Sequence, residues 1–324
     1  MEKERGSKLY QDRIYGTKVL SPLAVAVLDT AEFQRLASLK QLGFTDQVYR
    51  GALHTRFEHS VGAYFMCRTM MRRIVQNHDR LDLPHPGRHI SKTLATYPHD
   101  WISQELEEKI QKGKIPPSHQ APWRGLTEVV SVAALLHDLG HVPFSHTLED
   151  EFTGIYRRHD SLAGHRLYEM MFNEASELVK VFSDDVHEPW IKAVGSAGIS
   201  NQVLQRLIYV ILSWKEGVEP PRSFLEILAE DKAKEKDPDR QKRLVELEKW
   251  YKDFSSSSLF HPFMSDIVGN TICADLMDYL PRDRQNLGME WRLHHRLTRY
   301  FTIRKGGNFT RGGGILKKRV SDFL

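Results

Sequence analysis

Apolar side chains recur along most of the chain with the spacing of α-helices rather than the alternation of strands. The apolar positions of residues 22–41 predict helices that break around Asp29-Thr30. Residues 58–76 carry one apolar stripe, through Val61, Phe65, Met66, Met70 and Ile74. Residues 127–139 are apolar on nearly every side. We therefore expect that helix at the centre of the core.

The remaining segments complete an all-α prediction. Further helices are predicted at 161–182, 201–215 and 223–252, the last interrupted at Asp237-Pro238. At the C-terminal end, RYFTIRKGG and GGGILKKRV flank a glycine-rich turn and predict a β-hairpin within 299–320. The sequence thus predicts a helical core with a small C-terminal β-hairpin, and strand confined mainly to that hairpin.

The chain has 324 residues, enough for one large domain with a sizeable core. Residues 77–125 are polar, with several prolines and glycines, and read as an inserted surface lobe. We expect a single domain over 1–324 that carries this lobe and a truncated or divergent C-terminal part.

Composition narrows the class of protein. Hydrophobic residues make up 40% and charged residues 27% of the chain, which disfavours both disorder and a membrane protein. The first ten residues are polar and charged rather than a signal peptide, so we expect an intracellular protein without a membrane partner. Cys67 and Cys273 are too few for a disulfide framework or a thiolate cluster. The net charge of +4 is only a weak bias towards anionic partners.

Histidine carries more information. The chain has 16 histidines, and His-Asp pairs occur at His78, His99, His137 and His159. His137-Asp138 differs in context, because it ends an apolar helix and is followed by Gly140-His141 and PFSH. A buried carboxylate beside an imidazole is costly unless something positive or hydrogen-bonding meets it, as a divalent cation would. The alternative is a core histidine that caps the helix end with its aspartate.

Two other segments shift the balance towards a metal site. His59 stands in HTRFEHSVG, with Arg56 about one helical turn before it. The segment ADLMDYLPRD holds Asp275, Asp278 and Asp283, too many carboxylates for an ordinary helix interior.

These segments resemble the H…HD…D signature of the HD phosphohydrolase superfamily. The runs DTAEFQRLASLKQLG, HTRFEHSVG, LLHDLGHVPFSHTLE and DLMDYLPRD resemble its dNTP triphosphohydrolase branch, of the SAM-and-HD-domain type. The resemblance covers roughly residues 8–76, 126–182 and 262–303. It leaves out 77–125 and most of 183–255.

The resemblance implies a role for each matching residue. It implies one or two divalent metal ions, of Fe, Zn, Mn, Ni or Mg, held by His59, His137, Asp138 and Asp275. It implies phosphate contacts and acid/base chemistry from Arg56, His141, His146, Glu149 and His159. Sugar contacts are implied for Gln41, Leu42, Tyr279 and Asp283, and an activating guanine-nucleotide site for Lys8, Asp29 and Gln34. The implied reaction cleaves a deoxynucleoside triphosphate to deoxynucleoside and triphosphate.

Simpler interpretations stay open for several of these residues. His141 and His146 are also compatible with core histidines, His159 with a surface turn, and Tyr279 with helix packing. Arg56 could instead pair with Glu58 or a neighbouring carboxylate. The glycines at 312–314 suit a hairpin turn better than a phosphate cradle.

Three departures from the family pattern modify the expectation. Leu276 stands where the family has a phosphate-contacting lysine, and Ala37 stands where the activating site has an arginine. The chain also stops at Leu324, before the family segment that completes the nucleotide pocket. We therefore expect slow, poorly saturable hydrolysis that is independent of GTP.

Two other functions remain open, together with two kinds of partner. One is a phosphatase or phosphodiesterase acting on nucleoside monophosphates, cyclic nucleotides or nucleic-acid ends. The other is a catalytically weak nucleotide- or nucleic-acid-binding protein, which the basic tail RKGGNFTRGGGILKKR would allow. Besides a nucleotide substrate, the expected partners are a second copy of the chain and, less favoured, nucleic acid.

Overall fold

The computed structural model describes residues 6–80, 120–143, 166–167, 169–182, 262–269, 272–290 and 301, with isolated positions between 205 and 245. The described elements are β1 (Lys8–Asp12), β2 (Gly16–Leu20), α1 (Pro22–Leu28), α2 (Ala31–Gln34), η1 (Arg35–Ser38), η2 (Gly43–Gln47), α3 (Arg56–Arg80), α6 (Gln120–Leu136), α9 (Glu177–Val181), α14 (Pro262–Gly269) and α15 (Ala274–Asn286). This part of the chain is mostly helical, as predicted.

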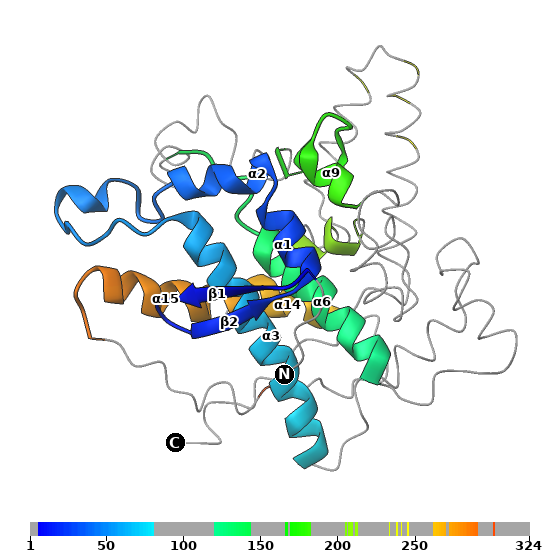
Figure 1. The fold of residues 1–324 in the computed structure, drawn as a ribbon, viewed down its shortest axis with the longest axis horizontal. Coiled ribbons are helices and arrows are strands. Elements are labelled where there is room, and N and C mark those ends of the chain that lie inside the picture. The colour runs from blue at the N-terminus through cyan, green and yellow to red at the C-terminus, as the bar shows by residue number, and fades with distance from the viewer. Residues whose placement is uncertain are drawn as a thin grey trace, which may run out of the picture.

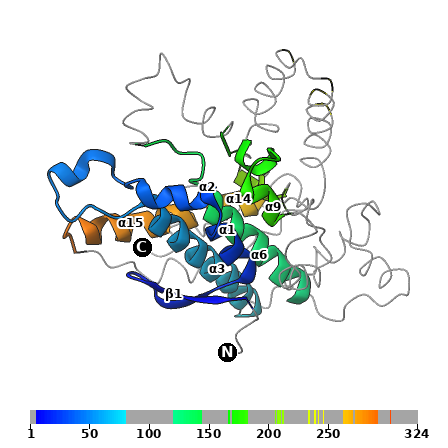
Figure 2. The ribbon, with the colours of Figure 1, turned by 45° about the horizontal axis from the view of Figure 1, so that its top comes forward.

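Helix α3 is the centre of the packing. It lies against both α6 and α15, and α14 contacts all three helices (Figures 1 and 2). The apolar stripe predicted for α3 is buried at Val61, Met70 and Ile74, and α6 is buried from Val129 to Leu136. Each such side chain contributes about 1.5–3 kcal/mol when it leaves water. The predicted burial of the apolar helix at 127–139 is therefore confirmed in α6, although α3 lies at the centre of the packing.

The predicted break around Asp29-Thr30 separates α1 from α2. Ser21 caps α1, because its hydroxyl accepts from the Ala24 N–H at 3.1 Å. Thr30 then caps α2 and also donates to the Val27 carbonyl at 2.8 Å. The hydroxyl satisfies backbone groups on both sides of the break, which is why the chain turns there.

The expectation that strand is confined mainly to a C-terminal hairpin is wrong. Strands β1 and β2 pair antiparallel near the N-terminus, with Asp12 opposite Gly16, below the helices in Figure 2. The Asp12 carboxylate accepts from the N–H groups of Ile14 and Tyr15, and Gly16 adopts φ +67°. An aspartate and a left-handed glycine are established turn residues. The predicted hairpin at 299–320 lies outside the described residues, apart from Phe301.

Other boundaries differ from the prediction. Helices α3 and α6 extend to Arg80 and from Gln120, so both ends of the expected lobe at 77–125 are helical, and its middle lies outside the described residues. The helix expected at 161–182 is interrupted before Ser176, whose hydroxyl caps α9. Among the described helices, none is long and apolar enough to cross a membrane.

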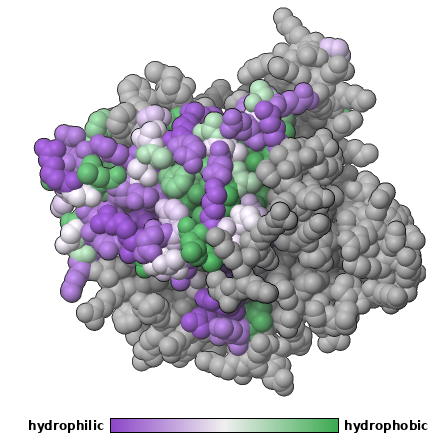
Figure 3. Space-filling view, in the orientation of Figure 1, coloured by the Kyte–Doolittle hydropathy of each residue, from purple (hydrophilic) through white to green (hydrophobic). Residues whose placement is uncertain are grey.

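The segment between η1 and α3 projects from the helical body (Figures 1 and 2). It exposes Phe44, Val48, Tyr49 and Leu53, and Figure 3 shows apolar residues among hydrophilic ones on that side. An isolated bridge between Lys40 and Thr55 closes the base of the segment. Thr55 directly precedes α3, so the bridge lies next to the start of that helix, where the candidate site begins.

Candidate metal centre

The starts of two helices and the end of a third place the candidate ligands. Thr55 and Glu58 form a capping box at the start of α3: Glu58 accepts from the Thr55 N–H at 2.8 Å, and Thr55 accepts from the Glu58 N–H at 3.5 Å. This cap fixes His59 in the first turn of α3. His137 and Asp138 directly follow the buried helix α6, and Asp275 lies in the first turn of α15.

The four predicted metal ligands converge. The two Nε2 atoms of His59 and His137 lie 3.2 Å apart. An oxygen of Asp275 lies 3.1 Å from the first nitrogen and 3.5 Å from the second. Asp138 places one oxygen 3.3 Å from His137 Nε2 and the other 3.7 Å from His59 Nε2. His59, His137 and Asp138 thus form one group that could hold a metal ion, and Asp275 lies beside its two imidazole nitrogens.

Their hydrogen bonds show that a cation fits between them. His137 Nδ1 lies 2.7 Å from the Ala134 carbonyl, which can only accept, so Nδ1 carries the proton. His59 Nδ1 lies 2.8 Å from a carboxylate oxygen of Asp278 and donates likewise. In the neutral imidazoles, both facing Nε2 atoms therefore carry lone pairs. Two lone pairs at this distance, with two carboxylates beside them, match the donor set of a divalent metal ion.

The electrostatics agree with this assignment. Burial lowers the pKa of His59, but hydrogen bonds to Asp275 and Asp278 and the charge of Asp138 outweigh it and raise the pKa to about 10. Burial opposes the shift at Asp138 as well, yet the charges of His137, Arg56 and His141 hold its pKa well below the usual range. The site attracts positive charge strongly, and a metal ion would displace the imidazole proton.

Asp138 is held from two further directions. Arg56 Nη1 donates to one oxygen at 2.5 Å, and His141 Nε2 lies 3.2 Å from the other. Arg35 stabilises the loop that carries Asp138 and His141, because it donates to the His141 and Leu139 carbonyls at 2.7 and 2.5 Å. In this structure Arg56 therefore contacts a neighbouring carboxylate, and Glu58 belongs to the helix cap.

The predicted sugar-side residues lie along one face of α15. Asp275, Tyr279 and Asp283 are spaced four residues apart, so they follow one another along the helix at about 6 Å intervals. The Tyr279 ring lies 6.3 Å from the His59 ring. His54 Nε2 lies 2.7 Å from an Asp283 oxygen, and the Gln41 N–H donates to the His54 carbonyl at 3.0 Å. The Gln41 backbone is thereby held next to His54, the residue that contacts Asp283.

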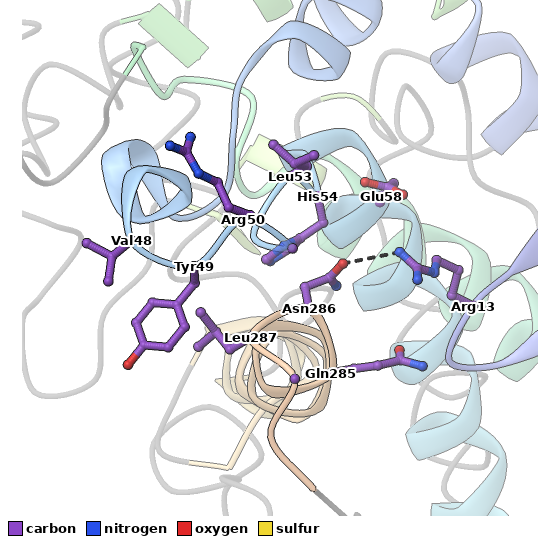
Figure 4. A pocket seen from close by; sticks show the side chains of 12 residues that line it. Arg13, Val48, Tyr49, Arg50, Leu53, His54, Glu58, Gln285, Asn286 and Leu287 are labelled. Atoms are coloured by element: carbon purple, nitrogen blue, oxygen red, sulfur yellow. Dashed lines mark hydrogen bonds between the residues drawn. The ribbon is translucent and has the colours of Figure 1, made fainter.

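A cavity of about 770 Å³ lies between residues 48–54 and the end of α15 (Figure 4). Its lining includes His54 and Asn286 but none of the four metal ligands. Arg13 donates to the Asn286 side chain at 3.2 Å across it. Asp283 lies on α15 between Asp275 and the lining residue Asn286, and it contacts the lining residue His54.

The remaining predicted residues divide into two groups. Lys8 and Asp29 form an exposed ion pair at 2.9 Å, and the Gln34 side chain donates to the Leu28 carbonyl at 2.8 Å. The predicted catalytic residues His146, Glu149 and His159 lie outside the described residues.

Several residues at the site were not predicted from the sequence. Asp278 binds His59, and His54 binds Asp283. Arg35 binds the His141 carbonyl, and Arg282 binds Asp278. Arg282 stands four residues after Asp278, a spacing typical of helical ion pairs, so that signal was present. The partners of His54 and Arg35 are 229 and 106 residues away, and no local pattern reports such contacts.

The family model of the HD domain matches residues 102–280, a range that contains three of the four predicted ligands and leaves out His59. A putative HD domain-containing protein of Acanthamoeba polyphaga mimivirus is 34% identical over 46% of this chain and 27% of its own length. The deoxynucleoside triphosphate triphosphohydrolase SAMHD1 of Gallus gallus is 30% identical over 47% of this chain and 18% of its own. The human protein of that name is 31% identical over 46% and 18%.

The chain therefore spans about a quarter or less of the length of these relatives. A solved structure, a hypothetical protein from Aquifex aeolicus, aligns with 20% identity and a TM-score of 0.48 over 92% of this chain and 52% of that one. That score is too low to bear on the fold. The family match extends over more than half of the chain and contains the His137-Asp138 pair. The chain belongs to the HD domain family.

Proposed function

We propose that this chain is a metal-dependent phosphohydrolase that cleaves deoxynucleoside triphosphates to deoxynucleoside and triphosphate. The observation that carries the proposal is the pair of facing Nε2 lone pairs on His59 and His137, flanked by Asp138 and Asp275. The nucleotide class rests on the family resemblance and on relatives that are named deoxynucleoside triphosphate triphosphohydrolases.

The described residues divide the chemistry between them. A metal ion held by His59, His137 and Asp138, with Asp275 beside them, would supply a Lewis acid for a phosphate oxygen and for the attacking water. Arg56 fixes the orientation of Asp138 and brings positive charge to the site. His141 Nε2 lies 3.2 Å from the other oxygen of Asp138, so on this proposal it brings an imidazole beside the phosphate. On this proposal His146 and His159 act as acid/base residues with Glu149 in support, and one histidine protonates the leaving 5′-oxygen.

The face of α15 gives a reason to place a nucleotide along it. Tyr279 stands one turn from the metal ligand Asp275, and Asp283 stands two turns away, about 12 Å along the helix. A phosphate at the metal would bring the sugar towards these side chains. The Gln41 side-chain oxygen is buried without a partner among the described residues, and a sugar hydroxyl would satisfy it.

Leu276 weakens the triphosphate side of the proposed site. Lysine at this position would add one charge-assisted contact, worth about 1.5–3 kcal/mol, or roughly one to two orders of magnitude in affinity. We therefore expect Leu276→Lys to tighten dNTP binding by that factor and to leave nucleoside monophosphates unaffected. If it improves neither dNTP affinity nor rate, and the unaltered protein readily cleaves monophosphates or cyclic nucleotides, a phosphatase or phosphodiesterase is the correct function.

The proposal is tested by product identification from dGTP together with elemental analysis of the purified protein. Deoxyguanosine and intact triphosphate in equal amounts support it, whereas free phosphate or deoxyguanosine monophosphate contradicts it.

Replacement of His146 or His159 by alanine should leave metal bound and lower the rate by about 10²-fold or more. Bound metal with no hydrolysis of any nucleotide would favour the binding-protein alternative. Activation by GTP through Lys8, Asp29 and Gln34 is not expected, and addition of GTP to the assay checks this.

A further inference from the structure

A buried chain of charged side chains runs from the N-terminal hairpin to the metal ligand His59. Asp12, in the hairpin turn, accepts from Arg282 Nη2 at 3.0 Å. Arg282 also donates to both oxygens of Asp278, at 2.9 Å from Nε and 2.8 Å from Nη2. Asp278 in turn accepts from His59 Nδ1 at 2.8 Å. The relative exposures of the four residues lie between 0% and 3%.

The surroundings are built to admit this chain. Gly62 lies one turn after His59 on α3, and a Cβ there would come within 1.9 Å of Asp278 and 2.2 Å of Arg282. Any larger residue would thus displace the ion pair. Two carboxylates share one guanidinium, so the chain carries one surplus negative charge in a dry environment. Burying that charge is costly unless positive charge lies nearby, and the next group along the chain is His59.

We propose that Asp278, Arg282 and Asp12 are positioning residues that orient His59 for the metal ion and so make the N-terminal hairpin part of the metal centre. This proposal rests on the metal site of the proposed function. Asp278 fixes the proton on His59 Nδ1 and leaves Nε2 free for the metal. Such outer partners set ring orientation and raise ligand basicity, and their loss typically lowers metal affinity by about 10- to 100-fold.

Asp12 offers a way to perturb the chain at a distance. One of its oxygens accepts from the turn N–H groups of Ile14 and Tyr15, and the other accepts from Arg282. Asparagine keeps an oxygen for the turn and turns an NH2 group towards the guanidinium. Asp12→Asn therefore breaks the contact with Arg282 while it preserves the local turn.

The experiment measures the dissociation constant of Mn²⁺ and the unfolding temperature of the metal-free protein for each variant. Asp278→Asn should weaken Mn²⁺ binding by about 10- to 100-fold. Asp12→Asn should weaken it by a smaller factor, about 3- to 10-fold, because it acts through two further residues. In the double variant the effects should be less than multiplicative, since both substitutions break the same chain.

Glu128→Gln is the matched control. Glu128 pairs with Arg68 at 2.5 Å and joins α6 to α3, as Asp278 joins α15 to α3 through His59. Among the described contacts, neither Glu128 nor Arg68 touches a predicted metal ligand. This control should lower the unfolding temperature and leave the Mn²⁺ constant within about twofold. A merely structural role of Asp278 would give the same pattern as the control.

The outcomes separate this proposal from the proposed function. If the unaltered protein binds Mn²⁺ and Asp12→Asn and Asp278→Asn both bind it within about twofold as tightly, the positioning chain is refuted and the metal site stands. If the unaltered protein binds no Mn²⁺, Fe²⁺ or Zn²⁺, the metal site itself fails, and this proposal with it. Should Asp278→Asn fail to fold, Asp12→Asn decides.

Discussion

Substituting Gly62 by alanine should destabilise the protein, although helix propensity alone predicts the opposite. Gly62 lies in the first two turns of α3, where alanine is favoured over glycine by about 1 kcal/mol. The new methyl group would lie 1.9 Å from an Asp278 oxygen and 2.5 Å from its Cγ. Nonbonded atoms do not approach one another so closely, so either α15 or the side chains of Asp278 and Arg282 must move.

The change in the free energy of unfolding depends on whether the Asp278-Arg282 pair breaks or shifts intact. Breaking a buried ion pair so that one charge is left uncompensated costs about 3–5 kcal/mol. Forcing one extra carbon into a packed site costs about 1–3 kcal/mol when the neighbours can shift without losing the pair. Subtracting the gain of about 1 kcal/mol in propensity leaves a net loss of roughly 2–4 kcal/mol when the pair is broken and roughly 0–2 kcal/mol when the pair shifts intact. Mn²⁺ affinity should fall as well, because Asp278 would no longer hold His59.

Urea unfolding of the metal-free protein measures this loss, with Gly269→Ala as the matched control. Gly269 ends α14, and a Cβ there meets no atom of the described residues within 4 Å, so its replacement should change the free energy of unfolding by less than about 0.5 kcal/mol. If Gly62→Ala is as stable as the unaltered protein or more stable, the close approach of α3 to the Asp278-Arg282 pair is wrong.

Three further predictions follow from the site. Asp138→Ala should abolish both bound metal and hydrolysis, and full metal occupancy in that variant would refute the ligand assignment. In the metal-free protein the pKa of His59 is raised from 6.5 to about 10, so its contribution to stability is fully present below pH 6.5 and is lost as pH rises through 10. Thermal unfolding between pH 6 and 10 checks this slope, which added Mn²⁺ should reverse. His54→Gln removes the imidazole that contacts Asp283. Steady-state kinetics should show KM for a dNTP raised by about tenfold with little change in kcat. An unchanged KM would contradict a role for the His54-Asp283 pair in substrate binding.

The helical core could be predicted from the sequence because its apolar residues repeat with the helical period and lie in long segments. The stripe from Val61 to Ile74 and the run from Val129 to Leu136 needed no knowledge of their partners. The N-terminal hairpin could not be found in that way. Its strands bury only their last residues, Asp12 and Leu20, and Leu9 is 64% exposed, so no apolar alternation marks them. Only Gly16 and the turn carried a local signal.

The sequence by itself determined which residues are chemically suited to hold a metal ion, since His59, the His137-Asp138 pair and Asp275 stand in specific motifs. Only the tertiary structure decided what each of them meets. It placed Asp275 beside Nε2 of His59 and Asp278, three residues later, beside Nδ1 of the same ring. It also directed Arg56 to Asp138 and brought Asp12 to Arg282. The physical reason is that side-chain period reports which face of a helix is buried, whereas a hydrogen bond depends on the packing angle and register of two helices. Those are set by the whole core and by no single segment.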